Sequence, residues 1–143
     1  MISVQEAQKI VLKNSLDFGS EKIPFIKSVG RVLKEDILAD RDFTPFDRVS
    51  MDGIALDYTS FKNGERAFFI EGIQPAGSPQ ISLSNNKNCI EVMTGAVLPA
   101  NTNVVIRYED VLIEHGIAKI QIEEVSYFQN IHEKGKDRKE GDI

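Results

Sequence analysis

The apolar positions at the start of the chain recur at helical spacing. Four of them share one stripe of such a helix: Val4, Ala7, Ile10 and Val11. Ser3 followed by Glu6 is the S-x-x-E pattern of a capping box, in which each residue satisfies a backbone donor of the first turn. The pattern predicts a helix from about Val4 to Asn14, ended by Gly19, with its apolar stripe used for packing.

The segment that follows mixes short apolar runs with a proline and a glycine. Glu21 to Ile26 is expected to be extended around Pro24, which suits a sheet edge. Val29 to Leu33 is a compact apolar segment with a turn-forming glycine. Asp36 to Ala39 is predicted to be a short strand or a connector. We therefore expect a helix and a connector to precede the rest of the chain.

From Gly53 onward, short runs of branched and aromatic residues alternate with polar turns that contain Gly or Pro. This pattern predicts strands. The expected strands are Gly53–Leu56, Ala67–Ile73, Ile81–Leu83, Cys89–Met93, Val104–Val111 and Ala118–Ile122. Glu114-His115-Gly116 is expected to close a hairpin between the last two. The chain is therefore predicted to be a mostly β domain with a helical edge.

The stretch from Asp42 to Leu56, DFTPFDRVSMDGIAL, differs from an ordinary loop, because it combines two aromatic rings with a proline and several aspartates. Phe43 and Phe46 are expected to anchor this stretch in the core. Asp47 and Asp52 would then lie on a fixed backbone that faces a cleft. The stretch is a candidate site.

Composition narrows the class of protein. The chain has 143 residues, of which 41% are hydrophobic and 27% charged, so it suits one domain or two small intertwined ones. Its net charge of −5 argues against a nucleic-acid partner. Cys89 is the only cysteine, which excludes an internal disulfide and a thiolate metal cluster. The sequence has no signal-peptide pattern and no apolar run of about 20 residues, so we expect a cytoplasmic protein without membrane contact.

Three further places carry candidate chemistry, each with a simpler alternative. Thr94-Gly95 offers a hydroxyl beside a backbone that can approach a ligand, although spacing alone favours an ordinary turn. Glu109 is a candidate carboxylate or a solvated strand end. Asp137, in the charged segment from Asn130 to Ile143, is a candidate cation ligand together with His132, or part of a surface loop. Pattern and spacing alone give no reaction.

Four segments taken together resemble a known family. Phe43–Ala55 resembles the PxFDxSxMDGxA signature of the MoeA/gephyrin family, and Met93–Glu109 resembles its TGAxLPxGxxxVVxxE block. Asn130–Asp142 resembles its NIRxxGED region, and Gly30–Leu33 matches its GRVL element. The blocks occur in the family's order over nearly the whole chain. The sequence departs from these patterns at four positions: Arg48, Asn101, His132 and Lys136.

The resemblance implies an α+β, mostly β fold, with an N-terminal helix and the coiled or bifurcated β-sheets of the MoeA N-terminal region. It implies a helix and connector over residues 1–41, which belong to a dimer-forming subdomain. A β-rich subdomain with the MDG and TGA motifs would cover 42–137, and a return segment would begin at 138–143. Because family members continue into pterin-binding and C-terminal domains, we expect this chain to be the N-terminal part of a longer protein and inactive alone.

The resemblance also implies an activity. Family members are molybdopterin molybdenumtransferases, which insert molybdate into adenylylated molybdopterin and release AMP, with Mg²⁺ taking part. The implied catalytic residues are Asp52, Thr94 and Asp137, with Asp52 and Asp137 near the metal, and Gly53, Gly95, Asp47 and Glu109 around the bound cofactor. A homodimer is implied, and contacts with other molybdenum cofactor biosynthesis proteins are compatible with it. The alternative is a non-catalytic dimerisation or scaffold module of the same family.

Overall fold

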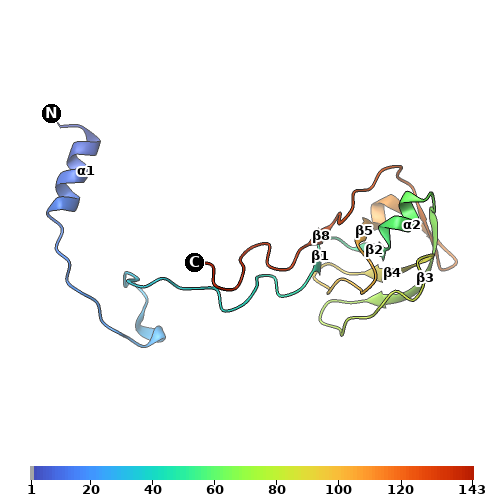
Figure 1. Cartoon of the computed structure of the whole chain (residues 1–143), viewed down its shortest axis with the longest axis horizontal. Coiled ribbons are helices and arrows are strands. Elements are labelled where there is room, and N and C mark those ends of the chain that lie inside the picture. Colours follow the sequence, from blue (N-terminus) through green and yellow to red (C-terminus); the bar gives the residue numbers. More distant parts are fainter. Residues whose placement is uncertain (1) are drawn as a thin grey trace. The chain divides into compact units, whose positions relative to one another are not determined.

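A computed structural model of the chain describes residues 2–143. The chain divides into two compact units, Met1–Ile37 and Leu38–Ile143, and Figure 1 shows the elements of each unit. Within residues 2–143, most of the regular structure lies in the second unit, which contains all of the strands described.

The first unit contains the predicted N-terminal helix. Helix α1 spans Val4–Lys13, and Asn14 caps its C-terminal end. The capping box is present: Ser3 Oγ accepts from the Glu6 N–H at 3.2 Å, and the Ser3 N–H donates to Glu6 Oε2 at 2.8 Å. The predicted helix is therefore confirmed, although it stops before Gly19. Its apolar stripe does not serve packing as expected, because no residue of the helix is buried.

The remainder of the first unit has no strand among its described residues. Pro24 leads instead into a short 3₁₀ helix, η1, at Phe25–Lys27, in which the Lys27 N–H donates to the Pro24 carbonyl at 2.8 Å. A turn follows at Gly30, whose φ is +80°. The expected extended piece at 21–26 is therefore wrong at its last two residues, Phe25 and Ile26. Residues 36–39 form a connector rather than a strand.

A six-stranded mixed sheet forms the core of the second unit. Its strands are β2 (Gly53–Leu56), β3 (Ala67–Gln74), β4 (Asn88–Val92), β5 (Val104–Arg107), β6 (Val111–Glu114) and β7 (Ile117–Ile120). They lie in the order β5-β2-β4-β3-β7-β6, and only the β3–β4 pair is parallel. A second, two-stranded sheet joins β1 (Arg48–Val49) to β8 (Ile131–His132). The predicted mostly β fold class is confirmed.

Both faces of the central strands are buried. Along β2, Ala55 packs into one apolar cluster with Ile90 and Val105, while Ile54 and Leu56 pack into another on the opposite face. A strand that is covered on both faces has a continuous apolar sequence rather than an alternating one. This explains why GIAL contains no polar residue, and it places the start of β2, where Gly53 follows Asp52, at the edge of a rigid core.

Helix α2 (Tyr58–Lys62) was not predicted. Asp57 caps it, because Asp57 Oδ1 accepts from the Thr59 N–H at 3.0 Å, and the buried ring of Phe61 packs into the second cluster. The pattern predicts only a polar turn between the strands expected at Gly53–Leu56 and Ala67–Ile73. That expectation holds only for its last part, where Asn63 ends the helix and Gly64 has a φ of +100°.

Two of the predicted strands are wrong in extent. The expected strand Val104–Val111 is split between β5 and β6 by a 3₁₀ helix, η2 (Tyr108–Asp110), where Arg107 Nη2 pairs with Asp110 Oδ2 at 2.8 Å. The expected strand at 81–83 reduces to one isolated bridge between Ser82 and Ala100. The hairpin at 114–116 is confirmed, because β6 and β7 pair in antiparallel register across His115 and Gly116.

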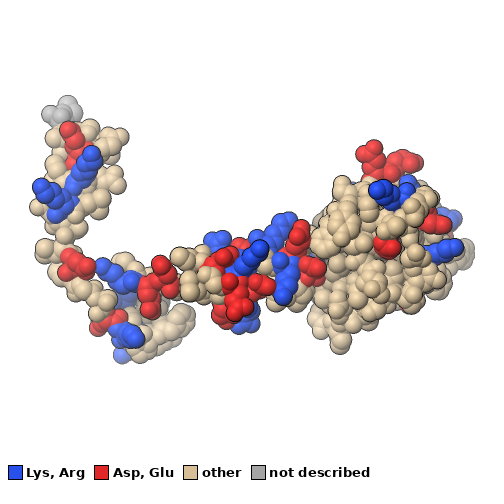
Figure 2. Space-filling model, in the orientation of Figure 1, with Lys and Arg blue, Asp and Glu red and all other residues tan. Residues whose placement is uncertain are grey.

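None of the helices in residues 2–143 combines the length and the apolar character needed to cross a membrane. Within the second unit, Figure 2 shows Lys and Arg side chains interspersed with Asp and Glu along the segments that lead away from the sheet. These segments are residues 38–49 and 130–142, which carry Asp47 and Asp137.

Candidate functional site

The residues before β1 and after β8 run side by side as an irregular antiparallel ribbon. The Ala39 N–H donates to the Asp142 carbonyl and the Phe43 N–H to the Arg138 carbonyl, each at 2.8 Å. Arg48 and Val49 then pair with His132 and Ile131. Each step forward along the first segment is therefore matched by a step backward along the second, as expected of two antiparallel strands. The first and third motif blocks are neighbours along its whole length.

Val49 joins three of the motif blocks, namely Phe43–Ala55, Met93–Glu109 and Asn130–Asp142. Its N–H donates to the Ala96 carbonyl and its carbonyl accepts from the Gly95 N–H, both at 2.9 Å. One residue further on, the Ser50 N–H donates to the Asn130 carbonyl at 3.0 Å. The Val49 side chain is fully buried. This residue thus fixes the MDG segment between the TGA segment on one side and residues 130–132 on the other.

Asp52 and Thr94 form the best-defined polar pair of the site. The Thr94 N–H donates to Asp52 Oδ1 at 2.6 Å, and Thr94 Oγ1 donates to the same oxygen at 2.7 Å. Both residues are exposed. The two hydrogen bonds, that from the backbone first, hold the pKa of the Asp52 carboxyl below its ordinary value of 3.8. Asp52 therefore presents an ionised, oriented carboxylate at neutral pH.

The two motif glycines allow this geometry for different reasons. A Cβ on Gly53 would lie 1.9 Å from the Ile106 carbonyl oxygen, so only glycine lets β2 approach β5 this closely. Gly95 has a φ of +89°, which permits the turn that contains Thr94, closed by the bond from the Ala96 N–H to the Met93 carbonyl at 3.0 Å. Both glycines thus have backbone roles beside the Asp52–Thr94 pair.

Asp137 lies on the loop between β8 and the outer part of the ribbon. Its N–H donates to the Phe43 carbonyl at 2.9 Å, and its Oδ1 lies 3.1 Å from His132 Nε2. The side chain is 57% exposed. Asp47 holds the same loop, because Asp47 Oδ1 accepts from the Lys134 N–H at 2.8 Å. Together with the bond from the Gly135 N–H to the Thr44 carbonyl, these contacts fasten the loop to the first motif block at three residues.

The structure does not gather every candidate carboxylate. Glu109 lies in η2 with an exposed side chain, one residue from Tyr108, whose N–H donates to the Asp52 carbonyl at 3.2 Å. Among residues 2–143, no group of three or more His, Cys, Asp or Glu side chains is placed to hold a metal ion. Asp52 and Asp137 therefore belong to no such group in this part of the chain.

Comparison with known proteins identifies the family. A family described as the MoeA N-terminal region (domain I and II) matches residues 2–143. The chain belongs to this family. A molybdopterin molybdenumtransferase from Synechocystis sp. is 47% identical over 120 residues, covering 84% of this chain and 31% of the relative. One from Staphylococcus epidermidis is 30% identical, covering 99% and 35%.

Solved structures of MoeA proteins support the same family assignment. The molybdopterin biosynthesis MoeA protein from Pyrococcus horikoshii OT3 matches with a TM-score of 0.80 and 31% identity, covering 97% of this chain and 38% of that one. A second MoeA crystal structure from Pyrococcus matches with a TM-score of 0.75 and 27% identity, covering 99% and 37%. The resemblance that the motifs indicate is thus confirmed. This MoeA N-terminal region spans about a third of the length of the relatives that it matches.

The expected anchors of the MDG stretch are wrong. Phe43 and Phe46 are 45% and 40% exposed, so neither ring is buried in the core. Backbone pairing with the return segment holds this part of the MoeA N-terminal region instead, and the buried side chains that fix it are Val49 and Ile131. The sequence did not reveal this arrangement, because the partner strand lies more than eighty residues away.

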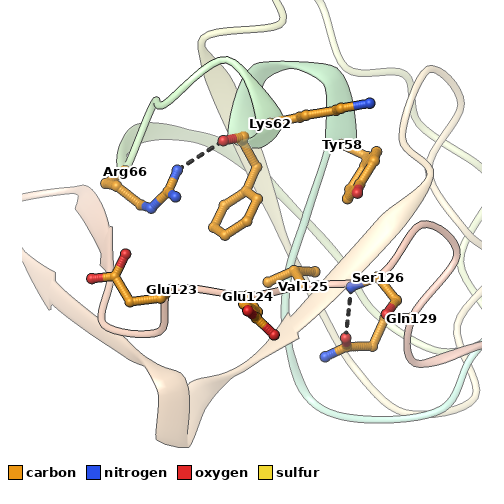
Figure 3. Close-up of a pocket in the computed structure, with 9 residues that line it drawn as sticks. Tyr58, Lys62, Arg66, Glu123, Glu124, Val125, Ser126 and Gln129 are labelled. Carbon is orange, nitrogen blue, oxygen red and sulfur yellow. Dashed lines mark hydrogen bonds between the residues drawn. The ribbon is translucent and has the colours of Figure 1, made fainter.

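One cavity, of ≈510 Å³, contains none of the predicted site residues (Figure 3). It lies between α2 and the segment after β7 and is lined by Tyr58, Phe61, Lys62, Arg66, Glu123, Glu124, Val125, Ser126 and Gln129. Arg66 Nη1 donates to the Phe61 carbonyl at 2.8 Å, and its guanidinium carbon lies 3.9 Å from the centre of the Phe61 ring. Sequence reasoning missed this cavity because it missed α2.

A smaller hollow of ≈240 Å³ does include a predicted residue. Asp47 and Phe46 line it, together with Gln80 and residues 97–102. Asp52 lies in neither cavity. In this MoeA N-terminal region the expected cleft is therefore found at Asp47, whereas the Asp52–Thr94 pair lies on the open surface.

Proposed function

We propose that this chain is the N-terminal part of a molybdopterin molybdenumtransferase, which inserts molybdate into adenylylated molybdopterin and releases AMP. The observation that carries the proposal is the Asp52–Thr94 pair, held at the point where all three family motifs meet on Val49. The relatives that match the chain bear the name of this activity. Because the chain spans about a third of their length, we assign it half of the site.

The chemistry of Asp52 suits a divalent cation. Both hydrogen bonds from Thr94 go to Oδ1, and no described residue donates to Oδ2. Mg²⁺ prefers oxygen ligands, and proteins commonly bind it through one or two carboxylates together with substrate phosphates and waters rather than through a complete protein cage. A single exposed carboxylate therefore fits Mg²⁺ at a site that a phosphate-bearing substrate completes. Asp137 would supply the second carboxylate.

The charge balance explains why acidic residues would lie at a molybdate site. Molybdate is a dianion, which an uncompensated Asp52 would repel. When bound, Mg²⁺ offsets this repulsion and polarises the phosphoanhydride or phosphoester link that is cleaved. Thr94 keeps the Asp52 carboxylate ionised and oriented. Gly95 leaves the backbone beside the pair open to a ligand, and Asp47 holds the Lys134 N–H. Glu109, which is exposed in η2, would lie beside the bound cofactor.

The proposed assembly is a homodimer. In the first unit, the side chains of Phe18, Phe25 and Val29 are 91%, 89% and 92% exposed. Exposed apolar side chains in such number are typical of surfaces that another protein covers. A second copy of the chain is the partner that the resemblance implies. The same surface supports the second candidate function, a dimerisation or scaffold module without catalysis.

A chimera tests the proposed activity. This chain replaces the matching region of the Synechocystis relative, and the product is incubated with adenylylated molybdopterin, molybdate and Mg²⁺. We expect pterin-bound molybdenum and released AMP in equal amounts, and neither product from the relative with that region deleted. A folded chimera that forms neither product would contradict the proposal. If light scattering then shows a dimer and titration shows no affinity for AMP, the scaffold function is favoured.

A further inference from the structure

Asp47 contacts the two segments that lie beside the first motif block, the TGA segment and the loop after β8. Its Oδ1 accepts a hydrogen bond from the Lys134 N–H at 2.8 Å, across 87 positions of sequence. Its own carbonyl accepts from the Leu98 N–H at 2.9 Å. One residue therefore fixes the TGA segment through its backbone and the loop from Glu133 to Asp137 through its side chain.

The bond from Asp47 to the Lys134 N–H differs in kind from the backbone–backbone bonds of that loop, which is also held by an ion pair between Lys134 Nζ and Asp42 Oδ2 at 3.4 Å. The Gly135 N–H donates to the Thr44 carbonyl at 2.8 Å, and the Asp137 N–H donates to the Phe43 carbonyl at 2.9 Å. Those two bonds join backbone to backbone, so they do not depend on the residue type at either acceptor. The bond to Lys134 needs a side-chain acceptor of the right length at position 47.

The hydrogen bond between Asp47 and the Lys134 N–H lies close to the candidate site. Lys134 lies in sequence between His132 and Asp137, whose side chains contact each other. His132 also pairs with Arg48 in the ribbon. Asp47 lies two residues before Val49 and five before Asp52. Releasing the Lys134 N–H would free the start of the loop that carries Asp137, while the Asp52–Thr94 pair keeps its own hydrogen bonds.

We propose that Asp47 is a positioning residue, which holds the Asp137 loop against the strand that leads to Asp52 and Thr94. This inference rests on the proposed function. The hydrogen-bond acceptor at position 47 matters for the reaction, whereas the negative charge there does not. Asp47 thus acts through Asp137 and touches neither the metal nor the substrate.

Three variants separate these roles. Asp47→Asn keeps an oxygen acceptor for the Lys134 N–H and removes the charge, whereas Asp47→Ala removes both. Asp40→Ala is the matched control, since the Asp40 side chain lies on the same ribbon and pairs only with its neighbour Arg41. In the isolated chain, we expect the Lys134 amide to exchange hydrogen about tenfold faster in Asp47→Ala, and at the wild-type rate in the other two.

The Val49 amide reports whether Asp47→Ala keeps the fold, because Val49 donates to Ala96 independently of the Asp47 side chain. We expect its exchange to be unchanged. Unchanged exchange of the Lys134 amide in Asp47→Ala would overturn the inference. Loss of protection at Val49 as well would also overturn it, because Asp47 would then support the whole ribbon rather than one loop.

Activity is measured in the chimera described above. We expect Asp47→Ala to lower the rate of molybdenum insertion by about tenfold to a hundredfold, the usual effect of a misplaced reacting group. Asp47→Asn should restore the rate to within about twofold of wild type. An Asp47→Asn rate as low as that of Asp47→Ala would overturn the inference and indicate a role for the charge itself. An inactive wild-type chimera would instead overturn the proposed function.

Discussion

Thr94 donates both its backbone N–H and its hydroxyl to one oxygen of Asp52, at 2.6 and 2.7 Å. The two residues are 42 positions apart in sequence. Strand pairing brings them together, because Gly53 at the start of β2 pairs with Val92 at the end of β4. The carboxylate is held through Oδ1, and no described residue donates to Oδ2. This arrangement is the centre of the proposed site.

Thr94→Val tests the cause of the low Asp52 pKa. The variant removes the hydroxyl donor and keeps the backbone N–H, which is the larger of the two causes. We expect the Asp52 titration midpoint to rise in the variant and to stay below 3.8, as measured by NMR of the side-chain carboxyl. Thr59→Val, in α2, is the control and should leave the midpoint unchanged. A variant midpoint equal to that of wild type would contradict the assignment.

The same pair makes stability depend on pH. Because folding lowers the pKa of Asp52, the stabilising contribution is present above the unfolded value of 3.8 and is lost as the pH falls below it. The wild-type chain should therefore be more stable than Thr94→Val at pH 6, and the difference should shrink at pH 3. Urea unfolding at both pH values measures it. A difference that grows toward low pH would contradict the account.

Gly53→Ala tests the close approach of β2 and β5. The added methyl group would meet the Ile106 carbonyl oxygen, which belongs to backbone in the core and cannot move alone. We expect the free energy of unfolding to fall by at least about 2 kcal/mol. Gly72→Ala is the control: its nearest neighbour is a side-chain atom of Ile81 at 3.5 Å, so its effect should stay within about 1 kcal/mol. Equal effects of the two substitutions would refute the steric argument.

Asp137→Ala in the chimera tests the proposed second carboxylate. If Asp137 contributes to the Mg²⁺ site, the Mg²⁺ concentration that gives half-maximal insertion should rise at least about tenfold. Asp40→Ala is again the control and should leave that concentration unchanged. A wild-type Mg²⁺ requirement in Asp137→Ala would show that the residue is no ligand, and would leave its role as the partner of His132.

The sequence predicted those parts of the fold that local patterns determine. The capping box fixed the start of α1, and the apolar runs of β2, β3 and β4 were long enough to identify strands. Helix α2 was missed because it has only five residues, with an Asp cap that also suits a turn. The strand expected after Val104 was too long because η2 interrupts it, and nothing in the local pattern marks the Arg107–Asp110 pair that accompanies the break.

The candidate site was predicted less completely, because its geometry depends on pairing between distant segments. Motif resemblance selected Asp52 and Thr94, and the structure shows that they are in direct contact. No periodicity could have shown that residues 130–142 lie along 38–49. The buried anchor was therefore assigned to Phe43 and Phe46, although Val49 holds that place.

The central claim is that the Asp52 carboxylate takes part in molybdenum insertion, and Asp52→Ala in the chimera tests it most directly. Asp40→Ala removes an equivalent exposed carboxylate from the same unit and serves as the control. We predict that Asp52→Ala melts close to the wild-type temperature and forms no pterin-bound molybdenum, while Asp40→Ala inserts it at the wild-type rate. Wild-type insertion by a folded Asp52→Ala chimera would contradict the claim.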